Sequence, residues 1–208
     1  MLDTLLKHAK HFTDTSKSGP AQVIHFYSDG SLFMSDSIIA VLASNIHTDG
    51  DHTRTSANQK CNGQLLQHSR MNALIGYADE VESTSFINCN IDVDELLAFT
   101  DGVNTASKFD GESTNKDLAL IQIDMDEVDG LVCSHRGVDF RAYYKDDSEK
   151  VESKKGAIVN GHKLTTVLKL FKQLGYEDVK LLIRDTFRPI EIRSYDAKIR
   201  SIILPIKK

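Results

Sequence analysis

Residues 160–175, near the carboxyl end of the chain, read NGHKLTTVLKLFKQLG and carry the clearest structural pattern in the sequence. Leucine, valine and phenylalanine recur there at helical spacing on one continuous face, while lysines lie elsewhere on the cylinder. Asn160 is a favourable residue at the start of such a helix, and Gly175 at its end. The pattern predicts a helix over 161–174, followed by strands over 179–184, 187–193 and 198–206. Pro189 in the middle strand indicates an edge or a bulge.

The same order of elements occurs earlier in the chain. Residues 3–6 read DTLL and residues 94–97 read DELL, and each stretch opens a helical pattern. Each pattern is followed by an apolar strand, an Asp-Gly pair (29–30 and 129–130) and further strands. An Asp-Gly pair between two β-rich runs predicts a hairpin. The sequence therefore predicts repeats of a helix plus a three-stranded antiparallel meander, an α+β fold, with residues 47–62 as a polar loop.

The amino-acid composition restricts the classes of protein to which this chain can belong. The chain has 208 residues, of which 40% are apolar and 26% charged, so one large or two small globular domains are expected. The longest apolar run, 38–43, is far shorter than the ~20 residues of a membrane helix, and no signal-peptide block precedes the first helix, so we expect a cytoplasmic protein. Three cysteines without a C-x-x-C pair argue against a disulfide framework or a zinc knuckle.

Charge is segregated along the chain. Residues 1–91 carry 6 basic and 9 acidic side chains (−3), residues 92–144 carry 4 and 12 (−8), and residues 145–208 carry 15 and 9 (+6). The sum is −5, which by itself does not favour a nucleic-acid-binding protein. The local field matters more than the total, however, and the last third of the chain is basic.

The carboxyl-terminal residues 194–207, SYDAKIRSIILPIK, are the most specific feature. Together with the preceding lysine-rich helix and strands, they resemble the last domain of the bacterial DNA polymerase III beta subunit, the sliding clamp. The resemblance covers residues 86–208 as a complete clamp domain and residues 1–47 as the opening half of another. It implies a DNA-clamp fold with the helices on one side of the sheets, and two domains: a shortened one over 1–85 and a complete one over 86–208.

The same resemblance implies a function and its residues. A clamp attracts the phosphates of duplex DNA without reading sequence, so the protein remains free to slide. Carried over to this chain, the lysines facing DNA are those of the first and last helices: Lys7, Lys10, Lys163, Lys169 and Lys172. The positions bordering the pocket for polymerase and clamp-loader peptides are Ile202, Leu204, Pro205 and Ile206. We expect no cofactor and a homo-oligomer, with two domains per chain implying a trimer ring and three a dimer ring; a monomer or an open dimer remains an alternative.

Two other functions remain as alternatives. Residues 47–52, HTDGDH, resemble the metallo-β-lactamase-fold signature His-x-His-x-Asp-His, so His47, Asp49, Asp51 and His52 are candidates for a metal-dependent hydrolase. The second alternative is a clamp-fold interaction module without DNA binding. The sequence has no phosphate-binding loop, no dinucleotide-binding turn and no nucleophile elbow, so we predict that the protein is not an enzyme.

Overall fold

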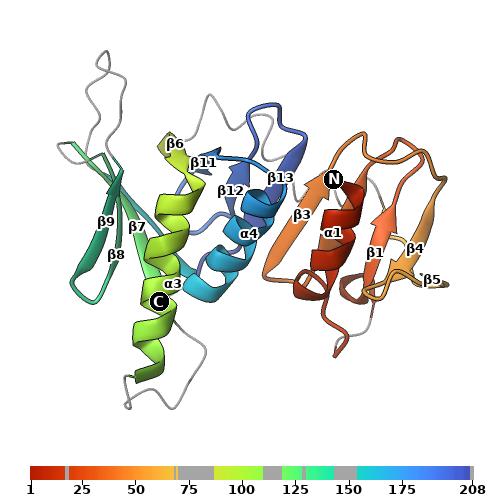
Figure 1. Cartoon of the computed structure of the whole chain (residues 1–208), viewed down its shortest axis with the longest axis horizontal. Coiled ribbons are helices and arrows are strands. Elements are labelled where there is room, and N and C mark those ends of the chain that lie inside the picture. The colour runs from red at the N-terminus through yellow and green to blue at the C-terminus, as the bar shows by residue number, and fades with distance from the viewer. Residues whose placement is uncertain are drawn as a thin grey trace.

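The computed structural model describes residues 1–16, 19–67, 69, 87–109, 119–127, 130–142 and 154–206 (Figure 1). Its α-helices are α1 (Leu2–His8), α3 (Val93–Phe109) and α4 (Gly161–Gln173), and its 3-10 turns are η1 (Ala9–His11) and η2 (Pro20–Gln22). The strands are β1 (Val23–Phe26), β2 (Leu32–Ser35), β3 (Ile39–Ala43), β4 (His52–Thr55), β5 (Lys60–Cys61), β6 (Ile87–Asp92), β7 (Leu120–Asp126), β8 (Gly130–His135), β9 (Val138–Ala142), β10 (Lys154–Asn160), β11 (Asp178–Ile183), β12 (Ile190–Arg193) and β13 (Ile199–Ile203).

The carboxyl-terminal part contains the same unit twice: a strand, a helix and a three-stranded meander. The first unit runs from β6 through α3 to β9, and the second from β10 through α4 to β13. The units exchange their first strands, because β6 pairs with β11 of the second unit and β10 pairs with β7 of the first. This exchange ties the two units into one folded body.

The amino-terminal part supplies α1 and a third meander, β1–β2–β3. Its last strand, β3, pairs antiparallel with β13, from Ile39↔Ile203 to Ala43↔Ile199. The result is one nine-stranded sheet, in the order β5-β4-β1-β2-β3-β13-β12-β11-β6, and a second sheet, β10-β7-β8-β9. The predicted domain boundary at residues 85 and 86 lies outside the described residues.

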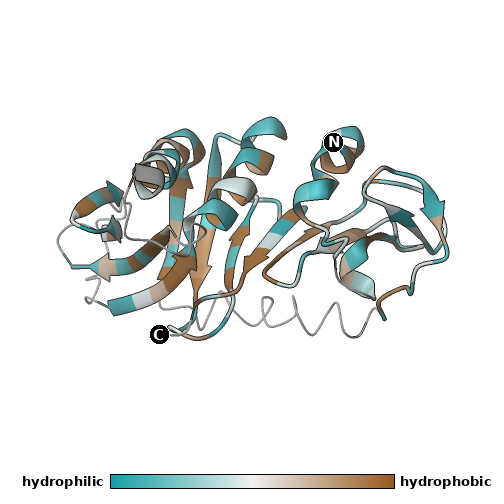
Figure 2. Ribbon diagram, turned by 90° about the horizontal axis from the view of Figure 1, so that it is seen from below, coloured by the Kyte–Doolittle hydropathy of each residue, from teal (hydrophilic) through white to brown (hydrophobic). Residues whose placement is uncertain are grey.

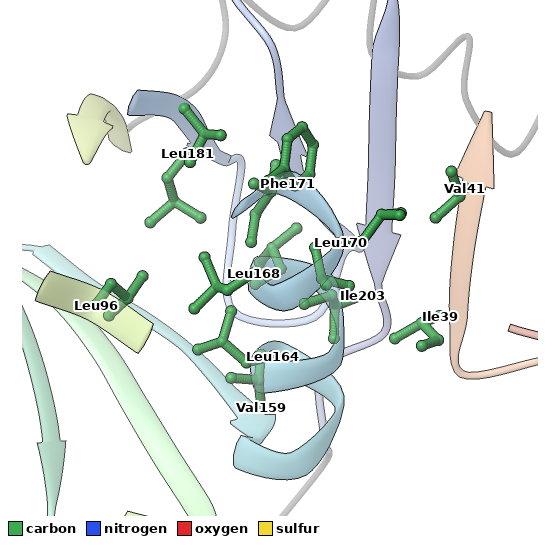
Figure 3. Packing of buried hydrophobic residues seen from close by; sticks show 14 of the residues in the cluster. Ile39, Val41, Leu96, Val159, Leu164, Leu168, Leu170, Phe171, Leu181 and Ile203 are labelled. Carbon is green, nitrogen blue, oxygen red and sulfur yellow. The ribbon is translucent and has the colours of Figure 1, made fainter. Parts of the chain in front are cut away.

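The helices α1, α3 and α4 all lie on one side of the sheets (Figure 2). The main core fills the space between the two layers. Leu164, Leu168 and Phe171 of α4 are fully buried, and Leu170 of the same helix lies beside Ile203 and Ile39 at the junction of β13 and β3 (Figure 3). One helix therefore covers the seam that joins the amino-terminal and carboxyl-terminal parts.

Both long helices begin at a capping side chain, as the sequence predicts for Asn160. Asn160 Oδ1 accepts hydrogen bonds from the N–H groups of His162 (2.9 Å) and Lys163 (3.3 Å), which caps α4. Asp92 Oδ1 accepts one from the N–H of Glu95 at 2.8 Å, which caps α3. The predicted α+β architecture, with helix-plus-meander repeats and helices on one side, is confirmed as well.

Two local predictions are wrong. Residues 47–62 are not a loop throughout, because β4 and β5 form a hairpin that pairs with β1. These two strands consist mostly of polar residues, so the sequence shows no alternation of apolar and polar residues there. Pro189 marks neither an edge nor a bulge: it precedes β12, which lies between β11 and β13, and its missing N–H therefore removes no ladder hydrogen bond.

No helix among the described residues is long and apolar enough to cross a membrane.

Candidate functional site

An apolar groove of about 330 Å³ lies on the face of the large sheet opposite the helices, where β2 and β3 meet β13. Its walls come from both ends of the chain: Pro20, Ala21, Phe33, Ser35, Ser37, Ile38, Ile39, Ala40, Leu66, Pro189, Ile202 and Leu204. The floor belongs to a second hydrophobic cluster on this face, which includes Phe33, Ala40 and Ile202. The groove exists because β3 and β13 pair, so it is a product of the fold and not of either part alone.

Two large apolar side chains at the groove remain open to solvent. Ile38 is 41% exposed and Leu204 is 40% exposed, although both lie beside a buried cluster. The N–H of Leu204 donates to the carbonyl of Ile38 at 2.9 Å, which holds the two residues side by side. Exposed apolar side chains on a concave surface favour an apolar ligand.

Two of the four residues predicted for a peptide pocket line this groove. Ile202 and Leu204 are lining residues, whereas Pro205 and Ile206 are not. The N–H of Ile206 instead donates to the carbonyl of Ile158 in β10 at 2.8 Å. The end of the described chain thus links the two sheets.

His25 holds two walls of the groove in place. Its Nε2–H donates to the carbonyl of Pro20 at 2.9 Å, and the N–H of Leu66 donates to its Nδ1 at 3.2 Å. The hydroxyl of Tyr27 donates to the carbonyl of Leu66 at 3.0 Å. Burial lowers the pKa of His25 below 6.5, and the hydrogen bond to Pro20 opposes that shift only in part. The ring is therefore neutral at physiological pH, as both of its hydrogen bonds require.

Acidification is expected to destabilise the protein through His25. In the folded state its lowered pKa keeps the ring neutral, whereas in the unfolded chain the ring takes up a proton near pH 6.5. The stability that the neutral His25 ring provides is therefore fully present above about pH 6.5. It is lost as pH falls toward the folded-state pKa of this ring. Denaturant unfolding at about pH 7.5 and about pH 5.5 measures the loss, which should be smaller in His25→Gln. The same loss in both proteins would contradict this role.

The lysines of α4 lie on the helix side of the molecule, but acidic side chains accompany them. Lys169 Nζ lies 2.9 Å from Asp101 Oδ1, and Lys172 Nζ lies 2.8 Å from Asp94 Oδ1. Both acids belong to α3, the neighbouring helix. Exposed ion pairs such as these contribute little to stability, but each pair cancels most of the field that its lysine would exert at a distance.

Lys163 has a structural partner. Its ammonium contacts Oδ2 of Asp36, a buried carboxylate whose Oδ1 accepts the N–H groups of Ile38 and Ile39, each at 2.8 Å. This contact connects the start of α4 to the turn before β3. Lys163 therefore supports the groove side of the fold as well as carrying charge on the helix side.

Lys7 and Lys10 differ from the α4 lysines in having no acidic partner within ion-pair distance among the described residues. Both are exposed, on the side of α1 and η1 that faces away from the buried residues Leu5 and Ala9. The positive charge of Lys10, together with His8 and Lys163, also adds to the effect of burial in lowering the pKa of His11. Among the described residues, the α1 end of the helix layer therefore carries two lysines without an ion-pair partner.

His47 does not offer a lone pair to a metal ion. Its Nε2–H donates to the carbonyl of Ser31 at 2.8 Å, and the N–H of Asp49 donates to its Nδ1 at 3.2 Å. Its ring centroid lies 4.9 Å from that of Phe26. The ring is packed and hydrogen-bonded on both nitrogens, as expected of a structural histidine.

Both ring nitrogens of His52 are hydrogen-bonded as well. Its Nδ1–H donates to the carbonyl of Gly50 at 2.7 Å, and Arg54 Nε–H donates to its Nε2 at 3.0 Å. The described part of the chain contains no group of three or more His, Cys, Asp or Glu side chains that could hold a metal ion. The interpretation of residues 47–52 as a hydrolase metal site is therefore wrong, and they form a turn that leads into β4.

Sequence reasoning missed most of the groove. Pro20, Leu66 and Pro189 come from three segments with no shared motif. Ile38 had a detectable signal: it stands next to Ile39 at the start of a strand, and neighbouring strand residues point to opposite faces, so one of the two must face away from the core.

The fold has close counterparts among solved structures. The Bacillus subtilis DNA polymerase sliding clamp matches with a TM-score of 0.73 and 13% sequence identity, over 100% of this chain and 62% of that one. The Streptococcus pneumoniae DNA polymerase III beta chain gives 0.71 and 13%, over 100% and 63%. A Helicobacter pylori beta clamp bound to a DNA ligase peptide gives 0.65 and 10%, over 99% and 63%.

This chain thus spans less than two thirds of the length of these clamps. Its sequence matches no protein-family model, and no curated protein is recognisably similar to it. The likeness lies in the three-dimensional arrangement and covers essentially the whole chain. The protein has the fold of the DNA polymerase III beta-subunit sliding clamps.

Proposed function

We propose that this protein is a clamp-type processivity factor, which holds duplex DNA against its helix side and docks partner peptides in the groove on its other side. It acts by binding, as neither an enzyme nor a cofactor-dependent protein. The observation that carries the proposal is the separation of the two faces: all three described α-helices cover one side of the sheets, and the apolar groove opens on the other.

The helix side suits duplex DNA best at its α1 end, where Lys7 and Lys10 are exposed and have no acidic partner within ion-pair distance among the described residues. Lys7 and Lys10 would make sequence-independent phosphate contacts, and Lys169 and Lys172 would make weaker ones because Asp101 and Asp94 stand beside them. Lys163 also stays among the proposed phosphate contacts, although Asp36 offsets part of its positive charge.

The groove suits an apolar peptide. Ile202 and Leu204 form part of its lining, and the proposed docking site extends to Ile38 and Leu66. Pro205 and Ile206 are proposed to border the site, and Ile206 is held by its backbone contact with β10. The Helicobacter pylori clamp of similar fold is bound to a DNA ligase peptide, which makes such a peptide a suitable probe.

Introducing charge into the groove is expected to abolish peptide docking. In a variant with Ile38→Asp and Leu204→Asp, a labelled DNA ligase peptide should bind at least about ten-fold more weakly, because its apolar side chains would meet two carboxylates. Both side chains are about 40% exposed, so the fold should tolerate the change. Fluorescence anisotropy measures the affinity.

Tyr195→Asp is the matched control, because Tyr195 is a large exposed side chain (53%) that does not line the groove. It should bind the peptide as the parent protein does. Equal weakening by both variants would contradict the assignment of the groove. Peptide binding without any affinity for duplex DNA would instead favour the interaction module.

We also propose that the protein self-associates and that its two parts, 1–85 and 86–208, correspond to a shortened and a complete clamp domain. Among the described strands, the large sheet ends in β5 and β6 and the small sheet in β10 and β9, so neither sheet closes on itself.

A further inference from the structure

The turn between β2 and β3, residues 35–39, forms one wall of the apolar groove and is called the turn wall below. Four of its five residues line the groove: Ser35, Ser37, Ile38 and Ile39. Ile38 is one of the two exposed apolar side chains there, and its carbonyl accepts the N–H of Leu204, another lining residue, at 2.9 Å. The shape of the groove therefore depends on where the turn wall lies.

The backbone of the turn wall is strained at one residue. Ser37 has a φ of 78°, a left-handed conformation that residues other than glycine seldom adopt. Such a conformation costs free energy and persists only where the surrounding structure holds it, and it occurs preferentially at sites that act on a ligand. Contacts on both sides of Ser37 must therefore hold the turn wall in this shape.

The side chain of Asp36 holds the residues that follow Ser37. Its Oδ1 accepts the N–H groups of Ile38 and Ile39, each at 2.8 Å, and the N–H of Asp36 donates to the carbonyl of Ile39 at 3.1 Å. The hydroxyl of Ser35 accepts the N–H of Ser37 at 3.1 Å and donates to the carbonyl of Ile39 at 3.0 Å. One carboxylate oxygen thus fixes both apolar residues of the turn wall.

The second carboxylate oxygen of Asp36 contacts a residue of the helix layer. Oδ2 contacts the ammonium of Lys163, in the first turn of α4. The Asp36 side chain is only 8% exposed, so loss of this cation would leave a poorly solvated negative charge. The turn wall on one side of the molecule therefore depends on a positive charge that comes from the other side.

This ion pair differs from the other ion pairs of α4. Lys169 and Lys172 pair with acids of α3, and both partners in each pair are about half exposed or more, so water replaces either partner at little cost. Removing one partner from a pair with a buried charge is far more costly. The contact between Lys163 and Asp36 is therefore the one of these three pairs whose loss should change the structure around it.

We propose that Lys163 and Asp36 are positioning residues of the groove, and that their ion pair holds the turn wall in the shape that binds a partner's apolar side chain. Neither residue lines the groove, so neither needs to touch the peptide. The inference rests on the proposed docking function and adds that peptide affinity depends on a residue of the helix layer. A wall that already has its bound shape lowers the entropic cost of docking.

Breaking the pair from either side should weaken docking. Lys163→Met leaves Asp36 without this cation, and Asp36→Asn places an amide N–H group against the ammonium. Each variant should bind the labelled DNA ligase peptide at least about five-fold more weakly, as measured by fluorescence anisotropy without DNA. Lys163→Arg keeps the positive charge and should bind within about two-fold of the parent protein.

The double variant Lys163→Met, Asp36→Asn distinguishes the ion pair from either side chain alone. The asparagine Oδ1 can still accept the two N–H groups of the turn wall, and no ammonium opposes its amide. The double variant should therefore bind the peptide more tightly than either single variant. Lys180→Met is the matched control, because it removes a lysine charge outside α4 and the groove, and it should bind as the parent protein does.

Denaturant unfolding establishes that each variant is folded in the binding assay, and Lys163→Gln replaces Lys163→Met if the latter does not fold. If the parent protein binds the peptide and the variant without Lys163 binds it equally well, the positioning role is overturned while the groove remains the docking site. A double variant that binds more weakly than both single variants overturns the role as well. A parent protein that does not bind the peptide overturns both the role and the docking function.

Discussion

Replacing Gly156 with alanine is expected to lower the free energy of unfolding by about 3 kcal/mol. A Cβ at this position would lie 2.0 Å from the backbone carbonyl oxygen of Ile123, in the paired strand β7. Real Cβ atoms do not approach a backbone atom so closely, and a backbone carbonyl in a sheet cannot turn away as a flexible side chain can. The strands must therefore separate.

The position of Gly156 explains why the cost is high. It lies where the register between β10 and β7 shifts, between Lys155 and Ala157, and its N–H donates to Asp124 Oδ1 at 2.8 Å. β10 is also the strand that the second repeat unit contributes to the sheet of the first. A distortion here loosens the contact between the two units as well as one hydrogen-bonded pair.

Gly102→Ala is the matched control. Gly102 lies within α3, and a Cβ there would meet no atom within 4 Å. Alanine should stabilise this helix by about 0.5–1 kcal/mol, because glycine loses more backbone entropy on folding. Thermal unfolding should therefore shift down by roughly 6–12 °C for Gly156→Ala and slightly up for Gly102→Ala. A neutral Gly156→Ala would contradict the packing described for β7 and β10.

Local patterns were sufficient to predict the helices and most strands. The face of α4 and its cap at Asn160 lie within one short stretch, so their signals do not depend on the rest of the fold. The β4–β5 hairpin could not be found in this way. Its strands are polar, and they form because the edge of β1 is available for pairing, which is a property of the tertiary structure.

The candidate sites, too, depend on tertiary contacts that local sequence patterns do not show. Lys169 and Lys172 were identifiable as exposed cations, but their partners Asp101 and Asp94 lie in another helix, so the sequence could not show that their charges are compensated. Of the groove residues, the sequence predicted Ile202 and Leu204, and Ile38 also carried a signal. Its other walls come from segments that the β3–β13 pairing brings together.

Reversing the charges of Lys7 and Lys10 is expected to have the largest effect on DNA binding. A Lys7→Glu, Lys10→Glu variant should bind duplex DNA at least about ten-fold more weakly at low salt. The slope of log affinity against log salt concentration should become shallower by roughly one unit per lysine. The reason is that these two exposed lysines, unlike those of α4, have no acidic partner within ion-pair distance among the described residues. Neither has a structural contact comparable to that of Lys163 with Asp36, so the fold should be retained.

The control reverses two charges that lie outside the helices. Lys180 projects from β11 away from the core residues Val179 and Leu181, and Lys198 lies in the turn between β12 and β13. A Lys180→Glu, Lys198→Glu variant changes the net charge by the same amount. Its affinity for duplex DNA should change far less than that of the helix-side variant.

The most direct test of the central claim is the affinity for duplex DNA, measured against salt concentration for the parent protein and these two double variants. If the helix side holds the duplex, the Lys7→Glu, Lys10→Glu variant loses affinity and salt dependence, while the Lys180→Glu, Lys198→Glu variant keeps both. Equal losses in the two variants, or no measurable affinity of the parent protein at low salt, would contradict it.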